Sequence, residues 1–84
     1  MADVTMYTTR FCPYCVAARR LLKAKGAEYT EIGVDGDHEL RQQMQEKAGQ
    51  RTVPQIWIGQ RHVGGFTDLA SLAADGELDQ LLAS

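Results

Sequence analysis

Apolar and polar residues follow one another along this chain with two different periods, and each period predicts one kind of element. Residues 3–7 alternate weakly, which suits a short strand whose successive side chains point to opposite faces. In residues 17–24 apolar positions recur every three or four residues, which is typical of a helix with one buried face. The same reasoning predicts three further strands at 27–34, 54–58 and 61–65, and three further helices through Leu40, Met44 and Ala48, through Leu69, Leu72 and Ala73, and through Leu78, Leu81 and Leu82.

Residues with strong turn and capping preferences mark the ends of these elements. Gly26 and Gly49 stand where a left-handed residue ends a helix, and Asp37 is the expected N-cap of the second helix. Gly59 occupies the first central position of a two-residue loop, which predicts a type II′ hairpin turn. Thr67 is the expected cap of the third helix.

The order of the predicted elements defines a fold class. It reads β-α-β-α-β-β-α with a short closing helix after Gly76, which describes an α/β fold with a four-stranded mixed sheet flanked by helices. The 84 residues suffice for one domain, so residues 1–84 are interpreted as a single domain. With 44% hydrophobic and 24% charged residues, the composition is that of an ordinary globular protein.

Charge and hydropathy limit the kinds of partner and the cellular location that we expect. The net charge of −2 combines basic segments, such as residues 1–27, with acidic ones, such as residues 28–46, and no basic stripe carries interleaved aromatic residues. We therefore expect no nucleic-acid partner. No apolar run approaches the roughly 20 residues that cross a bilayer, and the first ten residues lack a signal-peptide pattern. We expect a monomer in the cytoplasm without a membrane partner.

Two cysteines three positions apart, Cys12 and Cys15, are the main candidates for chemistry. A lasting structural disulfide is rare in a reducing cytosol, where such a pair is more often catalytic or metal-binding. Zinc usually needs four ligands, and the remaining candidates are His38 and His62, which do not have finger-like spacing. His38 is interpreted as a surface residue in the first turn of a helix and His62 as an outward hairpin residue, and no metal is expected.

The position of Cys12 favours a reactive thiolate. Pro13 is preferred at the first position of a helix, so Cys12 becomes the N-cap, where unpaired backbone N–H groups and the helix dipole stabilise an anion. Arg10 adds a nearby positive charge. Cys15 lies one turn later on the same face and deeper, so Cys12 is expected to attack a disulfide and Cys15 to resolve the mixed disulfide. Tyr14, between them, is a candidate substrate contact.

Three motifs in this order carry a resemblance to a known family: "CPYC" at 12–15, "TVPQI" at 52–56 and "GGFTD" at 64–68. Over nearly its whole length the chain resembles a glutaredoxin, of the small bacterial dithiol kind. The resemblance implies a thioredoxin-like fold in which Pro54 is cis and faces the cysteines across a cleft. It also implies that the backbone of Val53 pairs with an extended ligand as a neighbouring strand would.

The family's ligand is glutathione, which the resemblance implies as co-substrate. Its γ-glutamyl carboxylate would meet the N–H groups of Phe66, Thr67 and Asp68, and its ammonium the Asp68 side chain, while the second glycine of the Gly-Gly pair permits close approach. Many glutaredoxins have Lys where this chain has Thr9, and Arg10 and Arg51 are the available substitutes. The implied glutathione-binding residues are Arg10, Tyr14, Arg51, Thr52, Val53, Pro54, Gly65, Phe66, Thr67 and Asp68.

The function implied is a glutathione-dependent thiol–disulfide oxidoreductase that reduces glutathione mixed disulfides and protein disulfides through Cys12 and Cys15. Its partners would be glutathionylated or disulfide-containing proteins, with ribonucleotide reductase as a candidate client. Two alternatives remain open. One is a module in which two chains hold a [2Fe–2S] cluster between Cys12 thiolates and two glutathiones, against which the rigid Pro13 and the competing Cys15 argue. The other is a thioredoxin-like electron donor served by a flavoenzyme.

Overall fold

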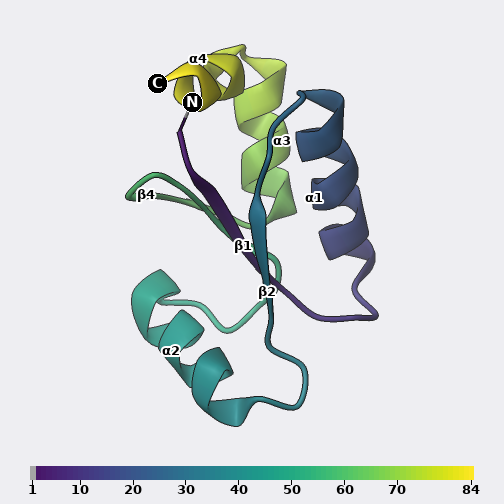
Figure 1. The fold of residues 1–84 in the computed structure, drawn as a ribbon, viewed down its shortest axis with the longest axis vertical. Coiled ribbons are helices and arrows are strands. Elements are labelled where there is room, and N and C mark those ends of the chain that lie inside the picture. Colours follow the sequence, from purple (N-terminus) through teal and green to yellow (C-terminus); the bar gives the residue numbers. More distant parts are fainter. Residues whose placement is uncertain (1) are drawn as a thin grey trace.

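The computed structural model describes residues 2–84, which form four strands and four helices (Figure 1). Every element expected from the hydrophobic pattern is present, in the expected order. The elements are β1 (Val4–Thr8), α1 (Pro13–Ala24), β2 (Thr30–Gly33), α2 (His38–Ala48), β3 (Gln55–Ile58), β4 (Arg61–Gly64), α3 (Phe66–Ala74) and α4 (Glu77–Ala83).

The four strands form one mixed sheet in the order β2-β1-β3-β4. β1 pairs in parallel with β2 and antiparallel with β3, while β3 and β4 pair antiparallel as a hairpin. The predicted mixed sheet is therefore confirmed. Because β1 lies inside the sheet and leads into α1, the loop with the first cysteine leaves the carboxyl end of a central strand.

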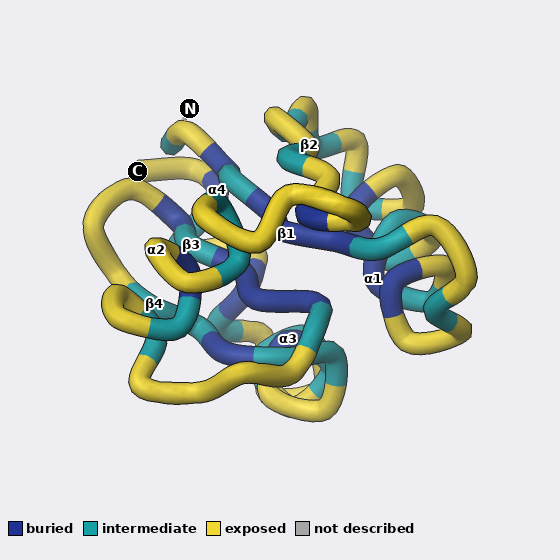
Figure 2. The backbone as a smooth tube through the Cα atoms, turned by 90° about the horizontal axis from the view of Figure 1, so that it is seen from below, coloured by how far each residue is buried: buried dark blue, intermediate teal, exposed yellow. Residues whose placement is uncertain are grey.

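The side chains of β1 alternate between two hydrophobic clusters, as the period of a strand requires. Val4 and Met6 pack in the larger cluster with residues of β3, α1, α3 and α4, whereas Tyr7 packs on the opposite face with Met44 of α2 and Val34. Buried positions accordingly gather along β1 in the middle of the molecule, and most of the connecting loops are exposed (Figure 2).

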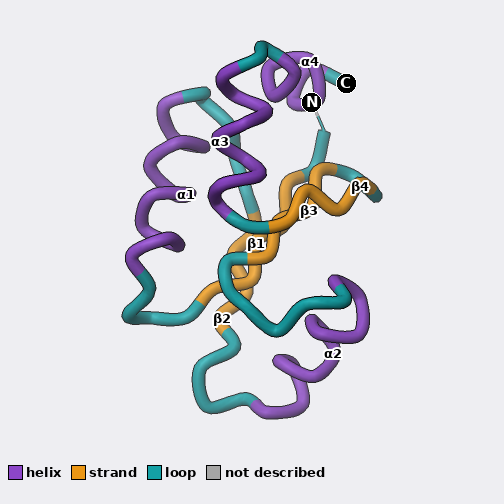
Figure 3. The backbone as a smooth tube through the Cα atoms, turned by 180° about the vertical axis from the view of Figure 1, so that it is seen from behind, coloured by secondary structure: helices purple, strands orange, loops and turns teal. Residues whose placement is uncertain are grey.

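The helices divide between the two faces in the same way. α1 and α3 lie side by side on one side of the sheet, with α4 next to α3, and α2 lies apart from them on the other side (Figure 3). None of the helices in residues 2–84 has both the length and the apolar character needed to span a bilayer.

Most of the predicted caps and turns are confirmed. Gly26 and Gly49 both have φ of 69°, and the Asp37 carboxylate accepts a hydrogen bond from the N–H of Leu40 at 3.0 Å. In the β3–β4 hairpin Gly59 has φ of 61°, and no described residue other than glycine has positive φ. This combination agrees with a type II′ turn and excludes type I′, which needs positive φ at both central residues.

Two predicted boundaries are wrong by more than one residue. The second strand is shorter than 27–34, because its pairing with β1 begins only where Thr30 meets Thr5. The cap of α3 is Gly65 and not Thr67, because the carbonyl of Gly65 already accepts the first helical hydrogen bond, from the N–H of Leu69 at 3.1 Å. Thr67 is the second residue of the helix.

Candidate active site

The first cysteine stands at the amino end of α1. Cys12 is the N-cap in extended conformation, Pro13 is the first helical residue, and the N–H of Cys15 donates to Cys12 Sγ at 3.2 Å. Cys12 is partly exposed, and its sulfur lies 3.6 Å from the carbonyl oxygen of Val53. The predicted helix-start position is confirmed, and a backbone N–H points at the sulfur as anion stabilisation requires.

The second cysteine is fully buried beneath the first. Burial and, after it, a hydrogen bond to the Cys12 side chain raise the pKa of the Cys15 thiol from 9.0 to about 12, against the lowering effect of a Thr9 backbone group. At neutral pH Cys15 therefore keeps its proton. A buried neutral thiol beside an exposed sulfur suits the expected division into an attacking and a resolving cysteine.

The raised pKa of Cys15 makes an alkaline stability change measurable. A neutral acid favoured by the fold contributes stability that is fully present below pH 9.0 and is lost as the pH rises toward 12. Cys15→Ala removes this titration. In urea unfolding with reductant, we expect wild type to lose about 1.4 kcal/mol relative to the variant for each pH unit above 9. A stability difference that stays constant from pH 8 to pH 10 would contradict the assignment.

A groove of about 260 Å³ brings together three stretches of chain that are far apart in the sequence. Tyr14 comes from the cysteine motif, and the other two stretches are the loop before β3 and the start of α3. The Val53–Pro54 peptide bond is cis, as expected. Seven of the predicted binding residues line this groove: Tyr14, Thr52, Val53, Pro54, Gly65, Phe66 and Thr67.

Asp68 and Gly64 shape the end of the groove at α3. Asp68 Oδ2 accepts a hydrogen bond from the N–H of Gly65 at 3.1 Å, which fixes the start of the helix. Gly64 has φ of 113°, and a Cβ atom there would lie 2.4 Å from Asp68 Oδ2, whereas a Cβ at Gly65 would make an ordinary 3.5 Å contact with the Pro54 carbonyl oxygen. The residue that must be glycine is therefore Gly64, which sequence reasoning missed although the Gly-Gly pair signalled it.

The two arginines predicted to replace the family's lysine are not among the residues that line this groove. The backbone N–H of Arg10 donates to Asp35 Oδ2 at 2.7 Å, and its Nε lies 3.7 Å from the same oxygen. Arg51 is exposed, and its carbonyl oxygen accepts from Arg41 Nη2 at 3.2 Å. Neither side chain lines the groove in the structure of residues 2–84.

A polar cluster next to Cys15 was not predicted. Arg19 Nη2 lies 2.6 Å from Glu31 Oε2, and the hydroxyl of the buried Thr8 donates to the same oxygen at 2.8 Å. The hydrogen bond from Arg19 lowers the pKa of Glu31, and the bond to Glu31 raises the pKa of Arg19. Its fixed positive charge opposes the effect of burial on the Cys15 thiol. No motif marks this cluster, because its members come from β1, α1 and β2 and meet only in the folded chain.

The prediction that His62 points outward is wrong. Its ring is partly buried, lies 4.7 Å from the Trp57 ring between centroids, and its Nε2 lies 2.7 Å from Gln55 Oε1. Residues 57 and 62 are cross-strand partners in the β3–β4 hairpin, which places the two rings on one face. His38 is the exposed first residue of α2, as predicted.

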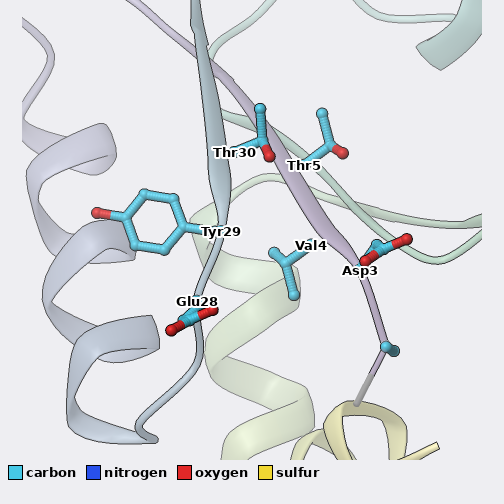
Figure 4. Close-up of a pocket in the computed structure, with 7 residues that line it drawn as sticks. Asp3, Val4, Thr5, Glu28, Tyr29 and Thr30 are labelled. Atoms are coloured by element: carbon cyan, nitrogen blue, oxygen red, sulfur yellow. The ribbon is translucent and has the colours of Figure 1, made fainter.

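A larger hollow, of about 670 Å³, lies elsewhere and contains none of the predicted site residues. It opens between the amino ends of β1 and β2, where Val4, Tyr29 and the acidic Asp3 and Glu28 line it (Figure 4). Cys12 follows the carboxyl end of β1, so this hollow has no part in the thiol chemistry. Within residues 2–84 no group of three or more His, Cys, Asp or Glu side chains is arranged to hold a metal ion.

The fold and the site together define a thioredoxin-like protein with a redox-active pair of thiols. The family model for glutaredoxin matches residues 4–63, and the chain belongs to the glutaredoxin family. It is 52% identical over 84 residues to a glutaredoxin of Pseudomonas aeruginosa, with the whole of both chains covered. It is therefore a thiol oxidoreductase of that family.

Solved structures agree with this assignment. The solution structure of glutaredoxin from Brucella melitensis superposes with a TM-score of 0.87 at 52% identity, covering 98% of this chain and 89% of that one. A crystal structure of a buckwheat glutaredoxin–glutathione complex superposes with a TM-score of 0.90 at 28% identity, covering 98% of this chain and 77% of that one. The predicted thioredoxin-like fold is confirmed.

Proposed function

We propose that this protein is a glutathione-dependent thiol–disulfide oxidoreductase that reduces glutathione mixed disulfides and protein disulfides. The observation that carries the proposal is the groove beside the nucleophile. The walls of the groove are the cis-proline loop and the start of α3, and Val53, whose carbonyl oxygen lies 3.6 Å from Cys12 Sγ, belongs to it. A small extended thiol peptide bound there has its sulfur next to Cys12.

The binding roles follow from the chemistry of each wall. The backbone of Val53 pairs with the extended tripeptide, which is the way one strand recognises another. The free N–H groups of Phe66, Thr67 and Asp68 receive the γ-glutamyl carboxylate at the positive end of α3, and the Asp68 carboxylate balances the ammonium group. Tyr14, 62% exposed, covers the side of the bound sulfur.

The reaction with a glutathione mixed disulfide proceeds in two exchanges. The Cys12 thiolate attacks the glutathione sulfur, a Cys12–glutathione disulfide forms, and the substrate leaves as a thiolate that takes up a proton. A second glutathione, as thiolate, then attacks the bound glutathione sulfur. The products are oxidised glutathione and the Cys12 thiolate.

A protein disulfide requires both cysteines. Cys12 attacks one sulfur of the substrate and releases the other as a thiol after protonation. Cys15 then loses its proton and attacks Cys12, so the substrate leaves fully reduced and a Cys12–Cys15 disulfide remains. Two glutathione molecules reduce that disulfide and become oxidised glutathione. Because burial raises the pKa of Cys15, its thiol has to lose the proton for this resolving step.

Recognition of the γ-glutamyl group is testable at Asp68. With a mixed disulfide of glutathione and cysteamine, we expect Asp68→Asn to raise KM about tenfold, the effect of one lost charge-assisted hydrogen bond. With the mixed disulfide of Cys-Gly and cysteamine, which lacks the γ-glutamyl group, wild type and variant should have equal rates. Glu39→Gln removes an acid from the first turn of α2 and serves as control. Equal losses on both substrates would contradict the binding mode.

The location and the partners are part of the same proposal. We propose that the protein works as a monomer in the cytoplasm, where glutathione is reduced and abundant enough to drive both exchanges. Glutathionylated and disulfide-containing proteins are the proposed substrates, with ribonucleotide reductase among the candidate clients.

A further inference from the structure

The loop from Gly49 to Pro54 forms one wall of the groove, and side chains hold most of it in place. Among residues 2–84, the backbone hydrogen bonds outside helices and strands include none from residues 50–54. The loop is bonded instead by Arg41, which donates to the carbonyl oxygen of Arg51, and by Gln55. Thr52 and Val53 of this loop line the groove, so these side chains bond the loop directly at its groove wall.

Gln55 makes more of these bonds than any other side chain. It is fully buried, and its Nε2 lies 3.0 Å from the carbonyl oxygen of Thr52, 3.2 Å from Thr52 Oγ1 and 3.0 Å from Gln50 Oε1. Gln55 is the first residue of β3 and follows the cis Val53–Pro54 bond. Its hydrogen bond to the Thr52 carbonyl therefore spans the cis-proline turn from one side to the other.

The amide of Gln55 has only one favourable orientation, because the Thr52 carbonyl contacts one end of the amide and His62 contacts the other. A carbonyl oxygen only accepts hydrogen bonds, so the Thr52 carbonyl requires the amide nitrogen of Gln55 and directs Gln55 Oε1 the other way. There Oε1 lies 2.7 Å from His62 Nε2, which must therefore carry the proton. In a neutral His62 ring, Nδ1 is then unprotonated.

The His62 ring is itself held by aromatic neighbours. It stacks on Trp57 at 4.7 Å between centroids, and Trp57 meets the buried Tyr7 edge-on at 5.3 Å. Lys47 of α2 covers the Trp57 ring, with its Nζ 5.9 Å from the centroid. The ring of His62 thus has a fixed position from which to donate.

We propose that Gln55 is a positioning residue for the glutathione groove, and that His62 holds Gln55 in the orientation that this role needs. Neither side chain lines the groove. Both act through Thr52 and Val53, whose backbone presents the groove wall to the ligand. The proposal rests on the proposed function, since it names residues that tune the same site.

The test uses a variant that keeps the ring and removes the donor. His62→Phe preserves stacking on Trp57 but leaves Gln55 Oε1 without a partner, whereas His62→Gln restores an N–H donor. We expect His62→Phe to raise KM for the glutathione–cysteamine disulfide about tenfold, with kcat unchanged, as follows when the fraction of molecules with the loop in its binding conformation falls to about a tenth. His62→Gln should recover most of the affinity. Arg61→Gln, on the same strand but paired with Glu77, is the matched control and should match wild type.

Two further readouts separate positioning from general damage. The rate with cystamine, the disulfide of cysteamine, should be unchanged in His62→Phe, because cystamine has no peptide backbone to pair with Val53 and Cys12 is untouched. Nitrogen-15 NMR of wild type, at a pH where the His62 imidazole is neutral, should show Nε2 protonated and Nδ1 not. Unchanged KM in His62→Phe, equal losses with the glutathione disulfide and with cystamine, or a neutral ring protonated at Nδ1 would each overturn the proposal. If wild type itself shows no preference for the glutathione disulfide, the proposed function fails, and the NMR result still decides the orientation of Gln55.

Discussion

Replacing Cys12 by Ser is expected to abolish every thiol activity of the protein, with a fall of at least about 10³-fold, because the nucleophile carries the whole covalent route. Replacing Cys15 by Ser is expected to leave the reduction of glutathione mixed disulfides within about tenfold of wild type, because a second glutathione resolves that intermediate. The same variant should lose reduction of protein disulfides. A glutathione-coupled assay on each substrate measures both rates.

The two serine variants control for each other. Each variant exchanges one sulfur for oxygen at the start of α1, where the backbone nitrogen of Cys15 lies 3.2 Å from Cys12 Sγ. General damage to the helix start would therefore affect both activities in both variants. Retained activity on either substrate in the Cys12 variant would contradict the mechanism. Loss of both activities in the Cys15 variant would show that the buried thiol is needed for more than resolution.

Replacing Gly64 by Ala is expected to have the largest effect on stability among the glycine positions. Its φ of 113° is a backbone conformation that side chains rarely adopt, and the new Cβ would meet Asp68 Oδ2 at 2.4 Å and Cγ at 3.0 Å. We expect a loss of about 3 kcal/mol in the free energy of unfolding, from backbone strain and from the broken Asp68–Gly65 bond. Urea unfolding at neutral pH measures it.

Gly33→Ala is the matched control. Gly33 lies in a strand with ordinary φ, and nothing stands within 4 Å of a Cβ there, so its variant should remain within about 0.5 kcal/mol of wild type. Because Gly64→Ala displaces Asp68, it should also weaken binding of the glutathione mixed disulfide. A Gly64 variant as stable as the Gly33 variant would mean that the β4–α3 junction accommodates the side chain by moving.

Local sequence signals were sufficient to predict those features of the structure that depend on residues close together in the sequence. Pro13 after Cys12 was enough to predict the helix start that sets the nucleophile, and Gly49 and Asp37 were enough to predict the ends of α2. The predicted cap at Thr67 failed for a related reason. Hydroxyl groups are common caps, but here the Asp68 side chain satisfies the N–H of Gly65 and moves the start of the helix by two residues.

The sequence by itself determined the order of the elements, the positions of both cysteines and, through three short motifs, the family. Only the tertiary structure decided which of two adjacent glycines excludes a side chain, where Arg10 directs its charge, and that His62 faces inward to Gln55. The physical reason is the distance along the sequence between the residues that interact. Capping and periodicity act within about one helical turn, whereas these contacts join residues that meet only after β1, β3 and β4 have paired.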